Sequence, residues 1–194
     1  MLQVVLDVET QKTFDEVGGF FPDRLGISFV GICVRDGYSG KGELRGFFEA
    51  DLPKLFPILE KADVLIGFNI DNFDMQTFVS YYAGDVSSFP TLDLLTQIKK
   101  SAGHRIGLDA VAQETLGVGK AGDGLDAIKY FQSKNWEALS KYCLQDVAVT
   151  RDIYDFGLSQ GQVKFRNKWN RLVECPVDFS FTPKKDNGVQ MSLL

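Results

Sequence analysis

The sequence predicts an α/β fold in which a central sheet is flanked by helices. In the first half of the chain, short apolar runs rich in β-branched residues are separated by polar, glycine-containing segments, a pattern typical of strands and turns. In the second half, apolar residues recur at intervals of three and four, the spacing of helices with one buried face. After Gly157, apolar and polar residues alternate again, which predicts a terminal strand hairpin.

Strands account for most of the first half. The run LQVVLDV, at residues 2–8, is predicted to be a buried strand that carries carboxylates at its far end. Residues 51–61 begin with an acid and an early proline and carry apolar residues at helical spacing, so they predict a short helix interrupted or bent near Pro57. The other strands predicted here are residues 26–34, 43–48 and 63–68.

Helices dominate the second half. The strongest helical pattern covers residues 135–156, where Leu139, Cys143 and Val147 form a stripe at intervals of four. The other elements predicted here are helices at residues 73–82 and 108–116 and a short strand at 91–95. The terminal hairpin is predicted from the alternating residues Val163, Phe165, Val177, Phe179 and Phe181.

Length and composition predict one soluble domain. The chain has 194 residues, of which 44% are hydrophobic and 24% charged, near the averages for globular proteins. We expect one domain over residues 1–183 and a flexible tail over 184–194, where breakers and charges begin. Three widely spaced cysteines favour a reducing cytoplasm over a disulfide framework. No apolar run approaches the length of a membrane span, and the N-terminus does not resemble a signal peptide.

The net charge of −5 argues against a polybasic nucleic-acid binder, which holds phosphate through bulk electrostatics. It does not exclude a nuclease. An enzyme that gathers carboxylates around divalent cations is acidic until the ions bind, and the ions then supply the positive charge that phosphate requires.

Two acids lie side by side at the end of the first predicted strand. Asp7 and Glu9 are two residues apart, a spacing that places both side chains on one face of a strand. Burying two carboxylates together is costly unless cations or hydrogen-bond donors compensate, so the pair indicates a metal site. A solvated strand end is the alternative interpretation of this pair taken alone.

Two further segments carry candidate site residues. Asp74 follows the strand DVLIGF, where the chain turns from strand into helix, and Asp71 beside it is suited to a helix-capping or loop role. Tyr142 and Asp146 are four apart and therefore share one face of the last long helix. That face adjoins the buried stripe, so both side chains are expected to point toward the sheet.

In this order, the three motifs resemble the DEDD exonuclease superfamily, and the tyrosine marks its DEDDy branch. The segments ADVLIGFNIDNFD, PTLDLL, GHRIGLDAVAQETLG and YCLQDVAVTRDIY are similar to the proofreading domains of family B DNA polymerases and their stand-alone bacterial relatives. The resemblance covers about residues 2–157. The other branch of the superfamily carries a histidine five residues before the last acid, a position that Lys141 occupies here.

The resemblance implies an RNase H-like fold with a mixed five-stranded sheet and a two-metal-ion 3′-5′ exonuclease. Two Mg²⁺ or Mn²⁺ ions are its implied cofactors, and single-stranded nucleic acid with a 3′ end, DNA before RNA, is its implied substrate. It assigns Asp7 to both ions, Glu9 and Asp146 to the ion that binds the nucleophile, and Asp74 to the other ion. Tyr142 is expected to orient the attacking water, because a tyrosine pKa of about 10 is too high for a base near neutral pH.

Substrate contacts are expected close to these motifs. The resemblance places Thr10 and the segment from Asn69 to Phe73 at the 3′-terminal nucleotide, although Phe73 equally suits the core. A basic cluster follows the predicted strand at 91–95 and is a candidate for the phosphate backbone, with a solvated loop as its alternative. The cluster consists of Lys99, Lys100, His104 and Arg105.

Three other functions stay open from the sequence: an RNA exonuclease resembling RNase D, an RNase H-like endonuclease, and a module that binds nucleic acid without cleaving it. No residue pattern identifies a contact to the ribose 2′-hydroxyl, which distinguishes RNA from DNA. A binding-only module is disfavoured because all five catalytic positions are filled.

The last five residues, QMSLL, resemble the pentapeptide with which many bacterial replication and repair proteins bind the sliding clamp. Gln190 would fix the register, while Leu193 and Leu194 would fill an apolar pocket. A frayed terminus whose leucines pack on their own domain is the alternative. A clamp tether would raise the local concentration of DNA ends without adding an active-site contact.

Overall fold

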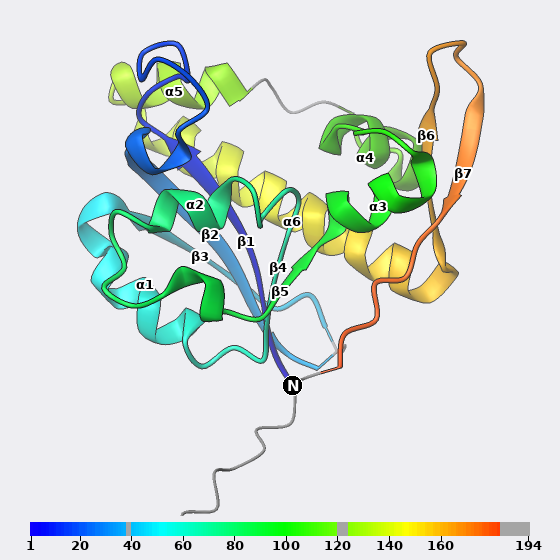
Figure 1. The fold of residues 1–194 in the computed structure, drawn as a ribbon, viewed down its shortest axis with the longest axis horizontal. Helices are drawn as coiled ribbons and strands as arrows, with labels where there is room; N and C mark the ends of the chain where they lie inside the picture. The colour runs from blue at the N-terminus through cyan, green and yellow to red at the C-terminus, as the bar shows by residue number, and fades with distance from the viewer. Residues whose placement is uncertain (38–39, 120–123, 183–194) are drawn as a thin grey trace, which may run out of the picture.

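The computed structural model describes residues 1–37, 40–119 and 124–182. A five-stranded sheet in the order β3-β2-β1-β4-β5 lies at its centre, with β1 in the middle (Figure 1). Its strands are β1 (Leu2–Thr10), β2 (Ile27–Asp36), β3 (Glu43–Phe48), β4 (Val64–Gly67) and β5 (Thr91–Asp93). The predicted tail and its clamp-binding residues Gln190, Leu193 and Leu194 lie outside the described residues and stay a prediction.

The sheet is mixed, as predicted. β1 pairs with β2 and β2 with β3 in antiparallel hairpin fashion, whereas β1 pairs with β4 and β4 with β5 in parallel. The parallel pairs are joined by crossover connections whose helices lie on one face of the sheet, and the helices that follow β5 cover the other face. The mixed five-stranded sheet flanked by helices, as expected from the sequence, is therefore confirmed.

Helices form a layer on each face of the sheet (Figure 1). Helices α1 and α2 pack with one face of β1, while α3, α4 and the long α6 pack with the other. Short 3-10 turns occupy Pro22–Arg24, Glu49–Asp51 and Val86–Ser88. The helices are α1 (Leu52–Leu59), α2 (Asp74–Phe78), α3 (Leu94–Ala102), α4 (Leu108–Leu116), α5 (Gly124–Gln132) and α6 (Trp136–Gln160).

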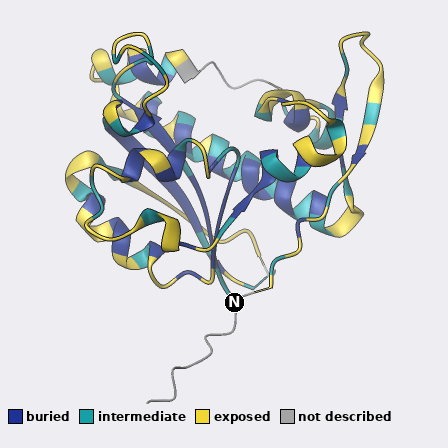
Figure 2. Ribbon diagram, in the orientation of Figure 1, coloured by how far each residue is buried: buried dark blue, intermediate teal, exposed yellow. Residues whose placement is uncertain are grey.

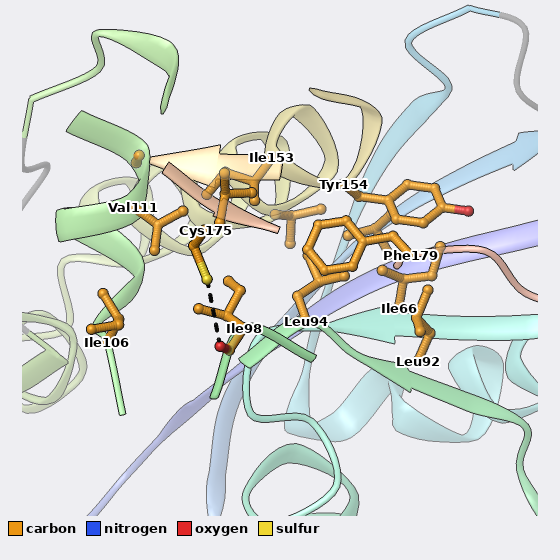
Figure 3. Packing of buried hydrophobic residues seen from close by; sticks show 14 of the residues in the cluster. Ile66, Leu92, Leu94, Ile98, Ile106, Val111, Ile153, Tyr154, Cys175 and Phe179 are labelled. Atoms are coloured by element: carbon orange, nitrogen blue, oxygen red, sulfur yellow. Dashed lines mark hydrogen bonds between the residues drawn. The ribbon is translucent and has the colours of Figure 1, made fainter. Parts of the chain in front are cut away.

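Alternate residues of β1 enter two different cores, so the strand is buried on both faces (Figure 2). Val4, Leu6 and Val8 pack with α1 and α2. Val5 packs on the opposite side with α3, α4 and α6, where Tyr154 and other large side chains fill the space between helix and sheet (Figure 3). Because side chains alternate along a strand, Asp7 and Glu9 share the α6 face with Val5.

The terminal hairpin forms, but its second strand differs from the predicted one. β6 (Gln162–Arg166) pairs with β7 (Leu172–Pro176), and residues 177–182 add no strand. Phe179 is buried instead against α6, with its ring 6.2 Å from that of Tyr154 (Figure 3). The alternating pattern at 177–181 therefore reflects intermittent burial of a loop, not a strand.

Four helices differ from the sequence prediction. α2 has only 5 residues, whereas the sequence predicts a helix over residues 73–82. α3 carries Lys99 and Lys100, which were interpreted as part of a charged loop, and α5 was not predicted. α1 continues through Pro57 to Leu59.

Each cysteine, Cys33, Cys143 and Cys175, is a buried free thiol. Among the described residues, none of the helices combines the length and apolar character that crossing a membrane requires.

Helix α6 approaches the C-terminal segment closely at Gly157. A Cβ atom added there would lie 2.3 Å from Cε2 of Phe179 and 3.2 Å from Cγ2 of Val177. Real Cβ atoms do not approach a ring this closely, so the ring must move when a side chain is added. The packing of Phe179 on α6 thus depends on the absence of a side chain at Gly157.

We expect Gly157→Ala to lower the free energy of unfolding by about 1–3 kcal/mol, the usual cost of overpacking a core. In a Phe179→Ala background the same change should become neutral or stabilising, because alanine is favoured over glycine in a helix by about 1 kcal/mol. Urea unfolding of the four proteins measures both effects. An equal loss of unfolding free energy in the two backgrounds would show that the Phe179 ring does not limit which side chain fits at position 157.

Candidate active site

Asp7 and Glu9 lie near the end of β1, on the face that packs with α6. Asp7 is opposite Gly31 of β2 and Glu9 is opposite Phe29. Glu9 is buried, Asp7 is partly exposed, and their carboxyl groups are in hydrogen-bond contact with each other. The spacing of two residues thus brings both acids to one point, as the sequence predicts.

Asp74 is the first residue of α2 and is attached directly to β1. Its Oδ1 accepts a hydrogen bond of 2.9 Å from the backbone N–H of Val8, between the two acids of the strand. The side chain is buried and its charge acts on that of Asp7. Asp71, three residues earlier, is exposed, in keeping with its expected loop role.

Helix α6 brings Tyr142 and Asp146 to the same point, because a glycine leaves space for it. A Cβ atom added at Gly31 would lie 3.0 Å from both Sγ of Cys143 and Cγ2 of Val147. The Sγ of Cys143 in turn lies 3.4 Å from the carbonyl oxygen of Asp7. α6 therefore rests on the backbone of β2 beside Asp7, and the adjoining helix face turns Tyr142 and Asp146 toward the strand.

The acids open into a cavity of about 540 Å³. Asp7, Glu9, Asp146 and Tyr142 line it, while Asp74 lies behind Asp7 and does not. The rest of its wall comes from the β1 end and the following loop (Val8, Thr10, Lys12, Thr13, Phe14, Leu25), with Phe73, Arg105, Leu125 and Ile128. A volume of this size suits a ligand as large as a nucleotide.

The carboxyl groups of this cluster hold protons more tightly than free ones. Burial raises the pKa of Asp7 to about 6, and burial together with the charges of Asp7 and Asp109 raises the pKa of Asp146 to about 7. Burial and then the neighbouring carboxylates raise the pKa of Glu9 and of Asp74 well above the usual range. In the part of the chain that the structure describes, no basic side chain forms an ion pair with these four acids.

The Tyr142 hydroxyl stays protonated in this surrounding. Burial raises its pKa, and the charges of Asp146, Glu9 and Asp7 raise it further. The hydrogen bond between Tyr142 and Asp146 lowers the pKa of the Asp146 carboxyl group, which opposes the effect of burial on that group. Tyr142 is therefore a hydrogen-bonding group beside the acids and not a base at neutral pH.

The donor set fits hard divalent cations. Asp7, Glu9 and Cys143 each offer an atom within 4.8 Å of the others, but burial raises the pKa of the Cys143 thiol and keeps it protonated. Carboxylate oxygens are the ligands that Mg²⁺ and Mn²⁺ prefer, whereas a thiol is not. Two such ions would relieve the charge repulsion that raises the carboxyl pKa values.

The predicted substrate residues are distributed over two cavities. Thr10, Phe73 and Arg105 line the cavity with the acids, while Asn69 and Arg105 line a second one of about 300 Å³. Lys100 lines neither of the two. It lies on α3 with its Nζ 3.1 Å from Oε1 of Gln97.

Several residues near the site were not identified from the sequence. The charge of Asp109, on α4, raises the pKa of both Asp146 and Tyr142. Asp93 is buried, its Oδ1 accepts the N–H of Asn69 at 2.9 Å, and its Oδ2 has no hydrogen-bond partner among the described residues. Asp109 lies in the segment GLDAV and Asp93 in PTLDLL. From the sequence, an acid at the start of a helix is interpreted as an ordinary helix cap.

An aromatic pair beside the cavity was also not predicted. Phe14 and Phe20, from the loop after β1, stack with ring centroids 4.7 Å apart, and Phe14 also contacts the edge of Phe73 at 6.1 Å. Phe20 is 63% exposed and lines the second cavity. Loop residues of this kind have no periodic pattern, and only the three-dimensional structure shows that they meet.

Comparisons with known proteins agree with this architecture. Residues 5–156 match the family model of the RNase H superfamily. The family B DNA polymerase of Pyrobaculum calidifontis superimposes with a TM-score of 0.61 at 17% identity, over 81% of this chain and 24% of that one. E. coli exonuclease I in complex with a 5cy-dT13 oligonucleotide gives a TM-score of 0.53 at 12% identity, over 82% of this chain and 41% of that one.

The chain thus spans less than half of either solved structure, and identities this low indicate a shared fold alone. The search among curated proteins finds no match.

The raised pKa values predict how stability depends on pH. For Asp7 and Asp146 the folded protein binds protons more tightly than the unfolded chain, whose carboxyl pKa is near 3.8. Metal-free protein should therefore lose stability as the pH rises from about 4 to about 7. Chemical unfolding in EDTA across this range measures the slope, and Asp146→Asn should flatten it. A stability that increases with pH over the same range would contradict the raised pKa values.

Proposed function

We propose that this chain, which belongs to the RNase H superfamily, is a metal-dependent 3′-5′ exonuclease that hydrolyses single-stranded nucleic acid, DNA in preference to RNA. The observation that carries the proposal is a cluster of four acids from three separate segments, three of which line one cavity together with Tyr142, while Asp74 adjoins Asp7. Structural acids are normally paired with a basic side chain. These four are not, and their burial is costly without cations.

Asp7, Glu9, Asp74 and Asp146 would hold two Mg²⁺ or Mn²⁺ ions. When bound, such ions neutralise charge on the phosphoryl oxygens and lower the pKa of the attacking water. Asp7 is central to the group, since its charge acts on each of the other three acids. This position agrees with the role of Asp7 as the ligand shared by both ions.

Tyr142 would orient the attacking water. Its hydroxyl is protonated at neutral pH, lines the cavity and hydrogen-bonds with Asp146, so it offers a fixed polar contact beside a metal ligand. A group that holds a water in line contributes to the rate through positioning and needs no change of its own charge.

The strand would pass from the first cavity into the second across Arg105. Arg105 lines both cavities, and Lys99 of α3 lines the second, so phosphates leaving the acids meet two cations. Phe20 offers an exposed ring on the other wall of the second cavity, suited to stacking on a base. Thr10 and Phe73 would contact the terminal nucleotide, and Asn69 the next one. Lys99 fits the phosphate path better than Lys100.

DNA is preferred in this proposal because the resemblance to polymerase proofreading domains extends over the acidic motifs. The exonuclease I structure that shares this fold holds a DNA oligonucleotide, which is in keeping with the same preference. The cavity lining shows no contact dedicated to a 2′-hydroxyl, so an RNA exonuclease is the nearest competitor.

We expect the protein to shorten a 5′-labelled single-stranded DNA in single-nucleotide steps when Mg²⁺ or Mn²⁺ is present, and to shorten RNA more slowly. Asp7→Asn should abolish cleavage, while Asp36→Asn, a matched change at an exposed acid opposite Leu2, at the other end of β1, should leave the rate unchanged. Gel analysis of both substrates measures this. Internal fragments would indicate an endonuclease, faster RNA shortening an RNA exonuclease, and no cleavage a binding module.

Tyr142→Phe should slow cleavage by roughly 10² to 10⁴-fold, the range for a positioned hydrogen-bonding group, because only the hydroxyl is removed. Single-turnover rates at saturating metal measure the effect, and a Mn²⁺ titration serves as the control for metal affinity. A rate equal to that of the wild type would assign Tyr142 to the core. A weakened Mn²⁺ affinity would assign it to metal binding.

A further inference from the structure

The tip of the β6–β7 hairpin carries an exposed tryptophan among basic residues. The turn reads RNKWNR at positions 166–171. Trp169 is 68% exposed, more than any other large hydrophobic side chain in the part of the chain that the structure describes. A ring this exposed has no role in the core and is available to a binding partner, and tryptophan is enriched at binding interfaces.

The turn holds Trp169 in a defined place. Oδ1 of Asn167 accepts the backbone N–H groups of Trp169 and Arg171 at 3.0 and 3.1 Å. The N–H of Asn170 donates to the carbonyl of Asn167 at 2.8 Å, and Asn170 adopts a φ of 58°, a conformation that asparagine tolerates. An ordered turn presents the ring at little entropic cost to a binding partner.

The hairpin is positively charged in an otherwise acidic chain. Residues 162–176 contain four basic residues and one acid, Glu174, a net charge of 4 − 1 = +3, against −5 for the whole chain. Two of the cations are neutralised, since Lys164 pairs with Glu174 and Arg166 with Glu114. Lys168 and Arg171, at the tip, form no ion pair with any described residue.

Lys168 also contacts the tryptophan itself. Its Nζ lies 4.4 Å from the centroid of the Trp169 ring, which places a cation against one face. An aromatic face with a cation beside it offers stacking for a base and a charge for the adjacent phosphate in one place. The combination is unusual for a surface that contacts an ordinary protein, where lysine is depleted.

The tip of the hairpin projects from the body of the protein (Figure 1), while β6 is fixed to α4 and to the segment before it. Thr115 of α4 exchanges two hydrogen bonds with the backbone of Lys164, at 2.9 and 3.0 Å. His104 contacts the edge of Phe165 in β6, with ring centroids 6.1 Å apart. Since His104 precedes Arg105, the residue that lines both cavities, the end of β6 next to the turn adjoins the end of the proposed strand path.

We propose that the hairpin tip is a second contact for the single strand, several nucleotides on the 5′ side of the end held at the acids. Trp169 stacks on an unpaired base, while Lys168 and Arg171 contact the flanking phosphates. The inference rests on the proposed function for its substrate. A single strand is favoured over a duplex because stacking requires a base that is free of its own neighbours.

The test compares the binding of oligonucleotides of two lengths by fluorescence anisotropy, with Ca²⁺ in place of the catalytic metal. A labelled dT4 reaches the acids alone, whereas dT20 also reaches the hairpin. Trp169→Ala should weaken dT20 binding about 5- to 150-fold, the range for losing one base stack, and leave dT4 binding unchanged. Trp169→Phe, which keeps a ring, should retain most of the affinity.

Charge is tested separately through the salt dependence of dT20 binding. Lys168→Ala combined with Arg171→Ala should reduce the slope of log affinity against log salt by about 1.4, which corresponds to two phosphate contacts on a single strand. Lys61→Ala, at an exposed lysine beyond α1, and Trp136→Ala, at a half-exposed ring outside both cavities, are the matched controls and should change neither quantity.

Unchanged dT20 binding by Trp169→Ala would overturn the proposal, as would an equal loss for dT4 or for a blunt duplex. The proposed function fails by a different result, namely no cleavage of dT4 by the wild-type protein with Mg²⁺ or Mn²⁺. The length-dependent loss of binding is measured without cleavage and would stand in that case.

Discussion

The contact between helix α6 and the sheet at Gly31 is the constraint on which the geometry of the candidate site depends. With no side chain at that position, Cys143 and Val147 rest on the strand backbone, and the adjoining face of α6 reaches Asp7. At the other end of the helix, Gly157 allows a similarly close approach to Phe179. α6 is therefore closely packed at two glycines, on the sheet at Gly31 and on the C-terminal segment at Gly157, and a side chain at either position would require its neighbours to move.

The same packing accounts for the electrostatic cost of the site. Asp7, Glu9 and Asp146 are held together by elements whose positions are set by large hydrophobic cores on both sides of β1, so their repulsion cannot be relieved by local movement. Sites that bind charged ligands commonly sacrifice stability in this way. In β1, alternate residues enter the hydrophobic cores, while Asp7 and Glu9, at the end of the strand, belong to the candidate site.

The sequence predicts those parts of the fold in which local pattern and burial coincide. β3 and α4 begin and end where expected, and the acids of β1 meet because a spacing of two is fixed by strand geometry. α3 was not recognised because its charged C-terminal half resembles a loop, and β7 because residues 177–181 alternate more clearly than 172–176. The Phe14–Phe20 pair, Asp93 and Asp109 depend on contacts between distant segments, which no local pattern contains.

The central position of β1 affects the order in which contacts form as the protein is synthesised and folds. Its partners arrive in order along the chain, first β2, then β4, and last α6, whose Cys143 contacts Asp7 across 136 residues. Contacts between residues so far apart in the sequence form late in folding, because closing a long loop costs conformational entropy before the contact is gained. During synthesis, the five strands and the first three acids are made well before Asp146, so the acidic cluster can be completed only once α6 has been made.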